Sequence, residues 1–592
     1  MALSKRRFPM KHQGHTTSDH ISTLISDTIG DMSSLGDTSA TFCATLVDEW
    51  VRLGVQHAVV APGSRSTPLA VALAARSEIS LHIFHDERSA SFAALGAALV
   101  SNVPSILLCT SGTAAAHFLA AVIEADLSGV PMIVCTADRP PEMRDVGAPQ
   151  TINQVHLYGG SVRWFHDPGV PSDDASHTWR SLASRAYSST LGERPGPVHL
   201  NLPFREPLLG APSDLPPARQ GGWSQRIRPV AVSLEGLDNF VERLSGRTGI
   251  IVAGKGSGRD VLALAAALGW PVFADPVSGV RECDPLVSTA FDPILRNAQF
   301  ADAHQPEVVL RIGAPPASKV LSQWVSRSGA EVLQICSTDS VTDPEHNVSV
   351  SLVSDVALLV RDLAVRVKSC HPKWISDWSR AETAAQVAIG EWTDIHMSEP
   401  TVARIVTASM KVGAHLVVSS SMPIRDVEWF GTVTPGVTVH SNRGANGIDG
   451  VVSTAVGVAI ASNAPVTLLI GDVATVHDSN GLWALARRGV NLTIVVTNND
   501  GGSIFSFLPQ ATQVEASTFE LLYGTPHGVS FEHLAAAHGI AFHRASTAGE
   551  LRALLGVDGV RMIEVPLDRS VNVSQHNELN DAVIQAISAT DE

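Results

Sequence analysis

The sequence contains little cysteine, and its cysteines show no paired spacing. Six of them are scattered over 592 residues without a Cys-x-x-Cys motif, which argues against the disulfide framework of a small secreted domain. Cys109 and Cys135 lie inside apolar runs that are typical of strands. We therefore expect reduced thiols buried in the core of a cytoplasmic protein.

Positive charge is also scarce. The chain has 42 Lys and Arg residues against 58 Asp and Glu residues, a formal net charge of −16. This balance disfavours non-specific binding to nucleic acid or to an anionic membrane surface. Any site for an anionic ligand must therefore be a local concentration of Arg and Lys.

Uninterrupted apolar runs of membrane-spanning length are missing as well. The longest apolar passage, 451–470, is broken by Asn463 and Pro465 and is typical of a buried helix followed by a strand. The first 38 residues are rich in Ser, Thr, His and Asp and lack the apolar segment of a signal peptide. We expect no membrane insertion, and we expect residues 1–38 to form a disordered extension.

The chain does have enough length and apolar content for several domains. Its 592 residues, 44% of them hydrophobic, suggest three or four cores. From Thr41 onward helix-like and strand-like patterns alternate, which predicts an α/β fold with doubly wound parallel sheets. A Pro- and Gly-rich passage is typical of a linker. The predicted domains are 39–206, 230–395 and 396–592, with a linker at 207–229.

One stretch of the last domain carries the strongest chemical signal. Two apolar runs, 466–470 and 492–496, flank a segment with helical character around 483–488. Interpreted as one parallel β/α unit, this stretch places Asp472 and Asn499 side by side at the carboxyl edge of a sheet, where ligands collect. A carboxylate, an amide oxygen and carbonyl groups of the following Gly turn are ligands that Mg²⁺ prefers. The alternative is that both side chains only cap strand ends.

An internal repeat connects this stretch with the first domain. Residues 104–138 can be laid over 465–499 with a single-residue gap, and both copies show the same order of strand, turn, helix and strand. Two related α/β domains are implied. Only the second copy carries Asp and Asn at its two turns, where the first has Ser111 and Asp138. We infer that one copy holds a metal and the other serves a different purpose.

The first domain offers Glu87 at the end of a predicted strand, 81–84. A carboxylate at the buried edge of a sheet is costly to ionise, and it can share a proton with a ring nitrogen of a ligand. The alternative is a surface residue paired with Arg88.

Four arginines lie at predicted strand ends. Arg65 and Arg139 belong to the first domain, and Arg425 and Arg443 to the third. Because an Arg side chain binds a carboxylate through two hydrogen bonds at once, four converging arginines suggest a substrate with several carboxylates. Each arginine taken singly is better explained as an ordinary surface residue. Because all four lie at predicted strand ends of the paired domains, we favour the functional interpretation for the group.

The middle domain opens with a glycine-rich stretch, 250–258. Its glycines are spaced G-x-G-x-G and not G-x-G-x-x-G, which favours a tight strand-to-helix turn over a dinucleotide site. Trp374, Trp378 and Trp392 follow on a predicted helix, and we expect them to anchor the packing of domains.

These motifs resemble those of a known family. Gly471-Asp472 followed by Asn498-Asn499 is similar to the motif with which thiamine-diphosphate enzymes hold the cofactor's pyrophosphate through Mg²⁺. From Thr41 to its end, the sequence resembles the 2-succinyl-5-enolpyruvyl-6-hydroxy-3-cyclohexene-1-carboxylate synthases of menaquinone biosynthesis, the MenD family. The stretches that carry this resemblance are 62–68, 86–88, 136–141, 442–450 and 499–505.

The resemblance implies a fold, a reaction and partners. It implies a pyrimidine-binding domain, a central transhydrogenase-like domain and a pyrophosphate-binding domain. It implies a transferase that decarboxylates 2-oxoglutarate on thiamine diphosphate and adds the succinyl-semialdehyde unit to isochorismate, releasing CO₂. The implied cofactors are thiamine diphosphate and Mg²⁺, or Mn²⁺ in its place. The implied assembly is a homodimer or homotetramer with active sites between subunits.

By matching position, the resemblance also implies roles for single residues. Glu87 would activate the cofactor and Ile448 would bend it, with Gln150 and Ser421 at the reacting centre. The implied ligands of the metal and pyrophosphate are Asp472, Asn499 and the Gly501 carbonyl. The residues implied to hold substrate are Ser64, Arg65, Arg139, Gln150, Lys319, Arg425, Arg443 and Phe505.

Two alternatives stay open at this point. One is another thiamine-diphosphate decarboxylase or synthase acting on a different 2-oxoacid, similar to acetolactate synthase. The other is a noncatalytic regulatory subunit that keeps the cofactor fold.

Overall fold

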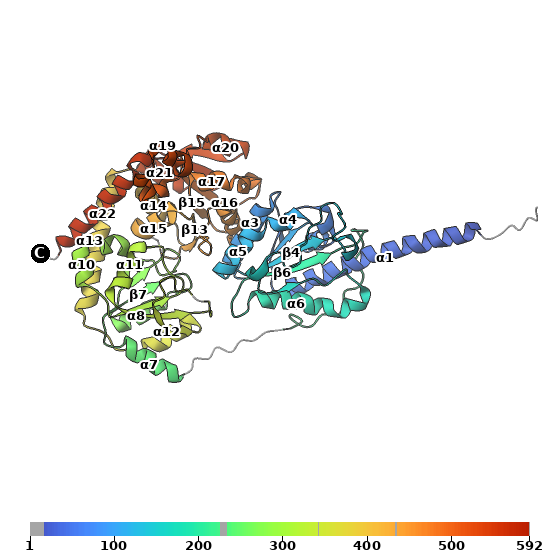
Figure 1. Cartoon of the computed structure of the whole chain (residues 1–592), viewed down its shortest axis with the longest axis horizontal. Helices are drawn as coiled ribbons and strands as arrows, with labels where there is room; N and C mark the ends of the chain where they lie inside the picture. The colour runs from blue at the N-terminus through green and yellow to red at the C-terminus, as the bar shows by residue number, and fades with distance from the viewer. Residues whose placement is uncertain (1–16, 225–233, 341, 433–434, 591–592) are drawn as a thin grey trace, which may run out of the picture.

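Three parallel sheets of six strands each organise the chain into three lobes (Figure 1). The computed structural model describes residues 17–224, 234–340, 342–432 and 435–590. Within those residues every strand pairing is parallel, and helices connect the strands. The α/β, doubly wound fold class predicted from the sequence is confirmed.

The first sheet has the strand order β2-β1-β3-β4-β6-β5. Its strands are β1 (His57–Val60), β2 (Ser80–Ile83), β3 (Ser105–Cys109), β4 (Met132–Asp138), β5 (Phe165–His166) and β6 (Pro197–Pro203). The helices of this domain are α1 (Thr17–Arg52), α2 (Thr67–Ala74), α3 (Glu87–Ser101), α4 (Thr113–Ala116), α5 (Leu119–Ser128) and α6 (Trp179–Thr190).

The third sheet repeats that order as β14-β13-β15-β16-β18-β17. The internal repeat seen in the sequence is therefore confirmed as two sheets of one topology. Its strands are β13 (His415–Val418), β14 (Thr438–His440), β15 (Val466–Gly471), β16 (Leu492–Asn498), β17 (Ala541–Arg544) and β18 (Arg561–Pro566). Its helices are α14 (Glu399–Ala408), α15 (Met422–Phe430), α16 (Val451–Ser462), α17 (Asp472–His477), α18 (Gln510–Gln513), α19 (Ala516–Phe519), α20 (Phe531–Ala537), α21 (Ala548–Leu555) and α22 (Asn572–Ser588).

The middle sheet has the order β12-β11-β10-β7-β8-β9, which is the doubly wound order. Its strands are β7 (Gly249–Ala253), β8 (Val272–Ala274), β9 (Val287–Ser288), β10 (Val308–Ile312), β11 (Glu331–Cys336) and β12 (Val348–Val353). Its helices are α7 (Leu234–Leu244), α8 (Val261–Leu268), α9 (Phe291–Leu295), α10 (Ala298–Ala303), α11 (Lys319–Ser328), α12 (Val356–Ala364) and α13 (Lys373–Ile395).

The glycine-rich stretch after β7 packs tightly against the loop after β10. A Cβ added at Gly254 would lie 1.5 Å from the carbonyl oxygen of Ala314, so no side chain fits there. This contact supports the tight-turn interpretation of the stretch. The three tryptophans of α13 are buried in the same core, and the Trp374 indole donates to the Gly249 carbonyl at 2.7 Å. Their predicted role as packing anchors is confirmed.

The first and third domains share one hydrophobic core, in which α3 lies against α16. A Cβ at Gly96 would lie 2.1 Å from the carbonyl oxygen of Thr454, and one at Gly457 would lie 2.2 Å from that of Ala93. The two helices therefore touch backbone to backbone. The C-terminal helix α22 leaves its own sheet and contributes Leu579, with further apolar residues, to the core of the middle domain.

The structure differs from two expectations for single segments. Residues 17–38, expected to belong to a disordered extension, lie within α1, which runs to Arg52; residues 1–16 lie outside the described residues. The helix expected around 483–488 is a 3₁₀ turn, and the helix after β15 is α17.

The domain ranges stay predictions. The strands of the three sheets fall inside them, and residues 207–224 form neither helix nor strand. The rest of the expected linker, 225–229, lies outside the described residues. None of the described helices has the length and apolar character needed to cross a membrane. Cys109 and Cys135 are buried free thiols, as expected.

Candidate active site

Asp472 and Asn499 lie side by side at the carboxyl edge of the third sheet. Asp472 begins α17 and is 2% exposed. Its Oδ2 accepts hydrogen bonds from the backbone N–H of Asn499 at 3.2 Å and of Gly501 at 2.9 Å, while Oδ1 accepts one from Val473 at 2.7 Å. Burial raises the pKa of Asp472, and the Gly501 and Val473 N–H groups oppose that shift. The carboxylate is thus fixed, and its Oδ1 accepts fewer hydrogen bonds than its Oδ2.

Asn499 is oriented by Glu399, a residue that the sequence analysis missed. The Asn499 Nδ2 donates to Glu399 Oε1 at 2.6 Å, which leaves Oδ1 buried and without a partner in the described part of the chain. Burial, and then the neighbouring Asp426, raise the pKa of Glu399 to about 7. Glu399 is the first residue of α14, and nothing in the sequence placed that helix beside Asn499.

His527 is a second missed residue. Its Nδ1 accepts a hydrogen bond from the Val529 N–H at 3.0 Å, so the ring proton lies on Nε2, which is 3.3 Å from Asp472 Oδ2. The Asp500 carboxylate accepts from the N–H groups of His527 and Gly528 at 2.9 and 2.8 Å. The loop around His527 thereby holds both sides of the turn that follows β16.

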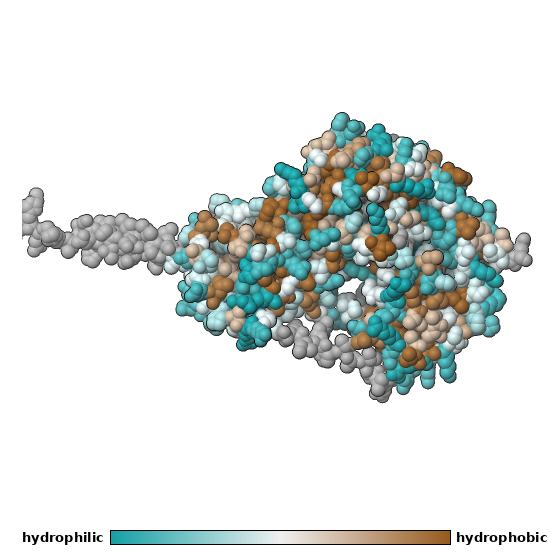
Figure 2. Space-filling view, turned by 180° about the vertical axis from the view of Figure 1, so that it is seen from behind, coloured by the Kyte–Doolittle hydropathy of each residue, from teal (hydrophilic) through white to brown (hydrophobic). Residues whose placement is uncertain are grey.

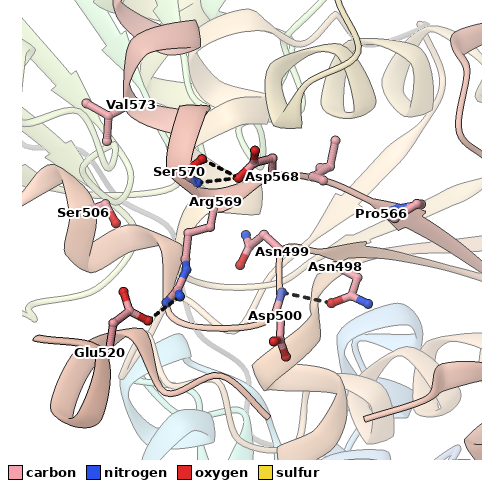
Figure 3. Close-up of a pocket in the computed structure, with 11 residues that line it drawn as sticks. Asn498, Asn499, Asp500, Ser506, Glu520, Pro566, Asp568, Arg569, Ser570 and Val573 are labelled. Carbon is pink, nitrogen blue, oxygen red and sulfur yellow. Dashed lines mark hydrogen bonds and ion pairs between the residues drawn. The ribbon is translucent and has the colours of Figure 1, made fainter. Parts of the chain in front are cut away.

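Gly501 fits only as glycine in this turn. Its φ is +148°, and an added Cβ would lie 2.0 Å from the Gly524 carbonyl oxygen. A cavity of about 620 Å³ borders the turn, with Asn499, Arg569 and Glu520 among its lining residues (Figure 3). Arg569 Nη2 donates to Glu520 at 2.6 Å.

The first domain has Ser111 and Asp138 at the turns that correspond to those of Asp472 and Asn499, and these two residues make different contacts. Asp138 is fully buried, accepts a hydrogen bond from Asn201 Nδ2 at 2.9 Å and pairs with Arg144 at 3.0 Å. Ser111 donates to the Gln150 carbonyl at 3.0 Å. These groups already have partners inside the protein, whereas Asn499 Oδ1 has none among the described residues.

A larger cavity of about 1060 Å³, here called the central cavity, lies where the three domains meet. Figure 2 shows the surface hollowed where the three lobes converge. The third domain contributes Ser421, Arg425, Arg443 and Ile448 to its wall. All four follow strands β13 or β14, so they share the carboxyl edge with Asp472.

Ser421 and Arg425 are locked together in this wall. The backbone of Ser421 has φ +76°, which is unusual for a residue other than glycine. Arg425 Nη1 donates to the Ser421 carbonyl at 2.6 Å. Burial lowers the pKa of Arg425 below its ordinary value, and the nearby Arg443 contributes to the shift. Two neighbouring guanidinium groups therefore face one cavity, which favours an anionic ligand.

The middle domain contributes Lys255 and Asp275 to the central cavity. Burial raises the pKa of Asp275, and the neighbouring Arg443 opposes that shift. Lys319, which the resemblance assigned to substrate, is exposed at the start of α11 and does not line this cavity. Phe505 lies in a 3₁₀ turn and packs against Tyr523, with 5.3 Å between ring centroids.

The expected first-domain residues gather at the carboxyl edge of the first sheet. Arg65 is 3% exposed, and its guanidinium donates to the Phe204 carbonyl at 2.9 Å and to Glu206 at 3.0 Å. Arg139 donates to the Pro149 carbonyl at 3.1 Å. This group, here called the first-domain set, consists of Ser64, Arg65, Glu87, Arg139 and Gln150.

Glu87 is half-buried at the first position of α3. The alternative of a Glu87–Arg88 pair is not seen among the described residues; Arg88 instead donates to the His477 carbonyl at 2.7 Å. Asp86 accepts from Asn480 at 2.7 Å. The residues on both sides of Glu87 thus contact the end of α17 and the turn that follows it.

Within one chain, the first-domain set does not line the central cavity. The cavity reaches the first domain at Gly129 and Pro195, which precede β4 and β6 and so lie at the amino edge of that sheet. The first-domain set lies at the opposite, carboxyl edge. The structure therefore brings the sequence-predicted residues together as two groups.

Comparison with known proteins identifies the class of molecule. Family models for the N-terminal thiamine pyrophosphate (TPP) binding domain, the middle domain and the C-terminal TPP binding domain of thiamine pyrophosphate enzymes match residues 41–157, 229–418 and 430–565. The solved structure of benzoylformate decarboxylase from Polynucleobacter necessarius superposes with a TM-score of 0.70 at 19% identity, covering 89% of this chain and 98% of that one. The fold and the matched domains define a thiamine pyrophosphate enzyme.

Closer relatives define the family within that class. The 2-succinyl-5-enolpyruvyl-6-hydroxy-3-cyclohexene-1-carboxylate synthase of Myxococcus xanthus is 42% identical over 93% of this chain and 98% of its own length. The synthase of the same name from Thermobifida fusca is 43% identical over 93% of this chain and 99% of its own length. The chain belongs to this synthase family, and the resemblance noted in the sequence is confirmed.

Proposed function

We propose that this protein decarboxylates 2-oxoglutarate on thiamine diphosphate and transfers the resulting four-carbon unit to isochorismate, with release of CO₂. The activity named for the relatives supports this, since they match the chain over nearly its full length. The observation that carries the proposal in this chain is the pair Arg425 and Arg443 in one cavity. Both proposed substrates are dicarboxylates, and guanidinium groups bind carboxylates through paired hydrogen bonds.

A divalent cation and the cofactor's pyrophosphate are proposed to bind at Asp472 and Asn499. The donor set fits, because Asn499 Oδ1 is buried without a partner in the described residues and Asp472 supplies a fixed carboxylate. With the Gly501 carbonyl this makes an oxygen-only set, which suits Mg²⁺ and also Mn²⁺. When bound, the thiamine ring supplies the electron sink for decarboxylation.

The remaining chemistry is assigned to residues of this chain. Glu87 is proposed to hold a proton next to the cofactor's pyrimidine ring. Ile448, half-buried at the wall of the central cavity, supplies an apolar surface that shapes the bound cofactor. Ser421 and Gln150 are proposed to orient the reacting carbonyl group, and Arg139 to hold a substrate carboxylate.

The complete active site is proposed to form between two copies of the chain. The central cavity contains Ser421, Arg425, Arg443 and Ile448 of the third domain. It meets the first domain of the same chain at the amino edge of that sheet, opposite to Glu87 and Arg65. A second copy presenting its first-domain set would complete the site, so a homodimer is the smallest proposed active unit. A cytoplasmic location stays a prediction that rests on the free cysteines.

A substrate assay tests the proposed reaction. Purified protein with thiamine diphosphate and Mg²⁺ should consume 2-oxoglutarate and isochorismate in equal amounts and leave pyruvate untouched. Consumption of pyruvate in preference to 2-oxoglutarate would instead establish an acetolactate-synthase-like activity. Full inertness toward every 2-oxoacid, with cofactor bound, would favour the noncatalytic alternative.

A further inference from the structure

Asp275 is an acidic residue of the middle domain whose role is not explained by folding alone. It follows β8 at the carboxyl edge of the middle sheet, lines the central cavity and is 1% exposed. Its Oδ1 accepts a hydrogen bond from the Val277 N–H at 2.8 Å. Its Oδ2 is buried and has no hydrogen-bond partner within the described residues. A buried carboxylate oxygen left in this way needs a nearby positive charge.

That charge comes from another domain. Arg443 Nη1 lies 3.7 Å from Asp275 Oδ2, which is too long for a hydrogen bond but short enough for a strong electrostatic attraction in a buried setting. The Nε and Nη1 atoms of Arg443 are themselves buried without hydrogen-bond partners in the described chain. The guanidinium is therefore held in place while these donors stay available for an incoming anion.

The neighbouring charged groups have other partners. Arg281 donates through Nη1 and Nη2 to carbonyl oxygens, including those of Ala274 and Val427. Glu428 accepts from the Ala317 N–H at 2.8 Å, and burial, followed by the charge of Asp275, raises the pKa of Glu428 to about 8. Asp275 is the carboxyl group that faces Arg443, with its Oδ2 3.7 Å from Arg443 Nη1.

We propose that Asp275 is a positioning residue for substrate recognition: it holds the Arg443 guanidinium toward the central cavity, where that group binds a carboxylate of a dicarboxylate substrate. The proposal rests on the proposed function. It also assigns the middle domain a part in the substrate pocket through Asp275 and not through Lys319. The two side chains are contributed by sheets that are distant in sequence, so their contact also ties the pocket to the packing of the two domains.

The test compares Asp275→Asn with the wild type in steady-state assays with 2-oxoglutarate and isochorismate. The substitution can keep an oxygen acceptor for the Val277 N–H, removes the negative charge and replaces Oδ2 by an NH₂ group. We expect KM for at least one dicarboxylate to rise about tenfold while kcat stays within about twofold, as for the loss of one partner of a buried charge pair. Asp302→Asn, on the exposed face of α10 in the same domain, should leave both constants unchanged.

A double-mutant cycle separates positioning from a general structural effect. In an Arg443→Gln background, Asp275→Asn should lower kcat/KM no further, because the group that it positions is gone. Asp275→Glu, which restores the charge, should lie closer to the wild type than Asp275→Asn. An unchanged or lowered KM in Asp275→Asn, or an equal loss in both backgrounds, would overturn the proposal.

These outcomes are distinct from failure of the proposed function. If the wild-type protein turns over neither dicarboxylate, the proposed function itself is wrong. If the wild type is active and Asp275→Asn matches it, only the positioning role is wrong. Should Asp275→Asn fold poorly, the comparison of Asp275→Glu with the wild type, in both backgrounds of Arg443, still gives the coupling between the two residues.

Discussion

Gly96 of α3 and Gly457 of α16 lie against each other where the first and third domains share a core. A Cβ added at Gly457 would lie 2.2 Å from the Ala93 carbonyl oxygen and 2.9 Å from the Gly96 Cα. These neighbours are backbone atoms, which cannot move aside as a flexible side chain can. The two helices that begin at Glu87 and at Val451 are thus fixed relative to each other by the absence of two side chains.

Gly457→Val should therefore destabilise the protein. Because the added atoms meet backbone on the facing helix, we expect the free energy of unfolding to fall by about 2–3 kcal/mol or more. Urea denaturation followed by circular dichroism measures this. Gly549→Ala is the matched control, since Gly549 lies in helix α21 with nothing within 4 Å of an added Cβ; it should be neutral or slightly stabilising. Equal losses in both variants would contradict the close contact.

Glu87→Gln should abolish most of the activity without preventing cofactor binding. A group that exchanges a proton with the cofactor contributes about 10²–10⁴-fold to the rate, whereas the pyrophosphate is proposed to bind in the third domain. We expect kcat to fall by that factor while the dissociation constant of thiamine diphosphate, measured by calorimetry, changes little. Glu78→Gln, at an exposed acid of the same domain, should have full activity. Retention of full activity by Glu87→Gln would remove the role assigned to Glu87.

His527→Ala should weaken binding of the divalent cation. His527 places Nε2 3.3 Å from Asp472 Oδ2, and loss of a group that orients a metal ligand typically costs about 10–100-fold in metal affinity. Titration with Mn²⁺ in the presence of thiamine diphosphate, followed by electron paramagnetic resonance, measures this affinity without an activity assay. His533→Ala, at an exposed position of α20, serves as the control. An affinity unchanged in His527→Ala would mean that Asp472 needs no support from that loop.

Acid should destabilise the protein through a buried histidine. Burial first, and then the neighbouring His415, lower the pKa of His440 to about 3. A histidine with a lowered folded pKa stabilises the fold fully above its unfolded pKa of 6.5, and this contribution is lost as the pH falls below it. The titration of His440 alone should lower the free energy of unfolding by about 2 kcal/mol between neutral pH and pH 5, at 1.36 kcal/mol per pH unit.

Comparison with His440→Gln isolates this effect from the other titrating groups. The glutamine cannot take up a proton, so the variant should lose less stability than the wild type between pH 7.5 and pH 5. Urea midpoints at the two pH values give the difference. Equal losses in the two proteins would show that His440 does not contribute to the acid sensitivity.

Much of the site could be predicted because parallel strands end at one edge of a sheet. Once β15 and β16 were recognised as neighbours, Asp472 and Asn499 had to lie together, and the repeat gave the first domain the same topology. Arg425 and Arg443 follow from the same argument. These inferences need only the local order of strand, loop and helix.

The missed features depend on contacts between segments distant in sequence. Glu399 reaches Asn499 across 100 positions, and no local pattern announces that contact. Asp275 meets Arg443 only because the middle and third domains both contribute to the wall of the central cavity.

Hybrid dimers test the central claim most directly, namely that the first-domain set of one chain acts on the same cofactor as Asp472 and Asn499 of another. Glu87→Gln and Asp472→Ala chains, each inactive alone, are co-expressed with different affinity tags, and the hybrid is purified through both. If sites form between chains, each hybrid dimer has one intact site and should show about half of the wild-type rate. If the hybrid is as inactive as either parent, both groups act within one chain and the account is contradicted.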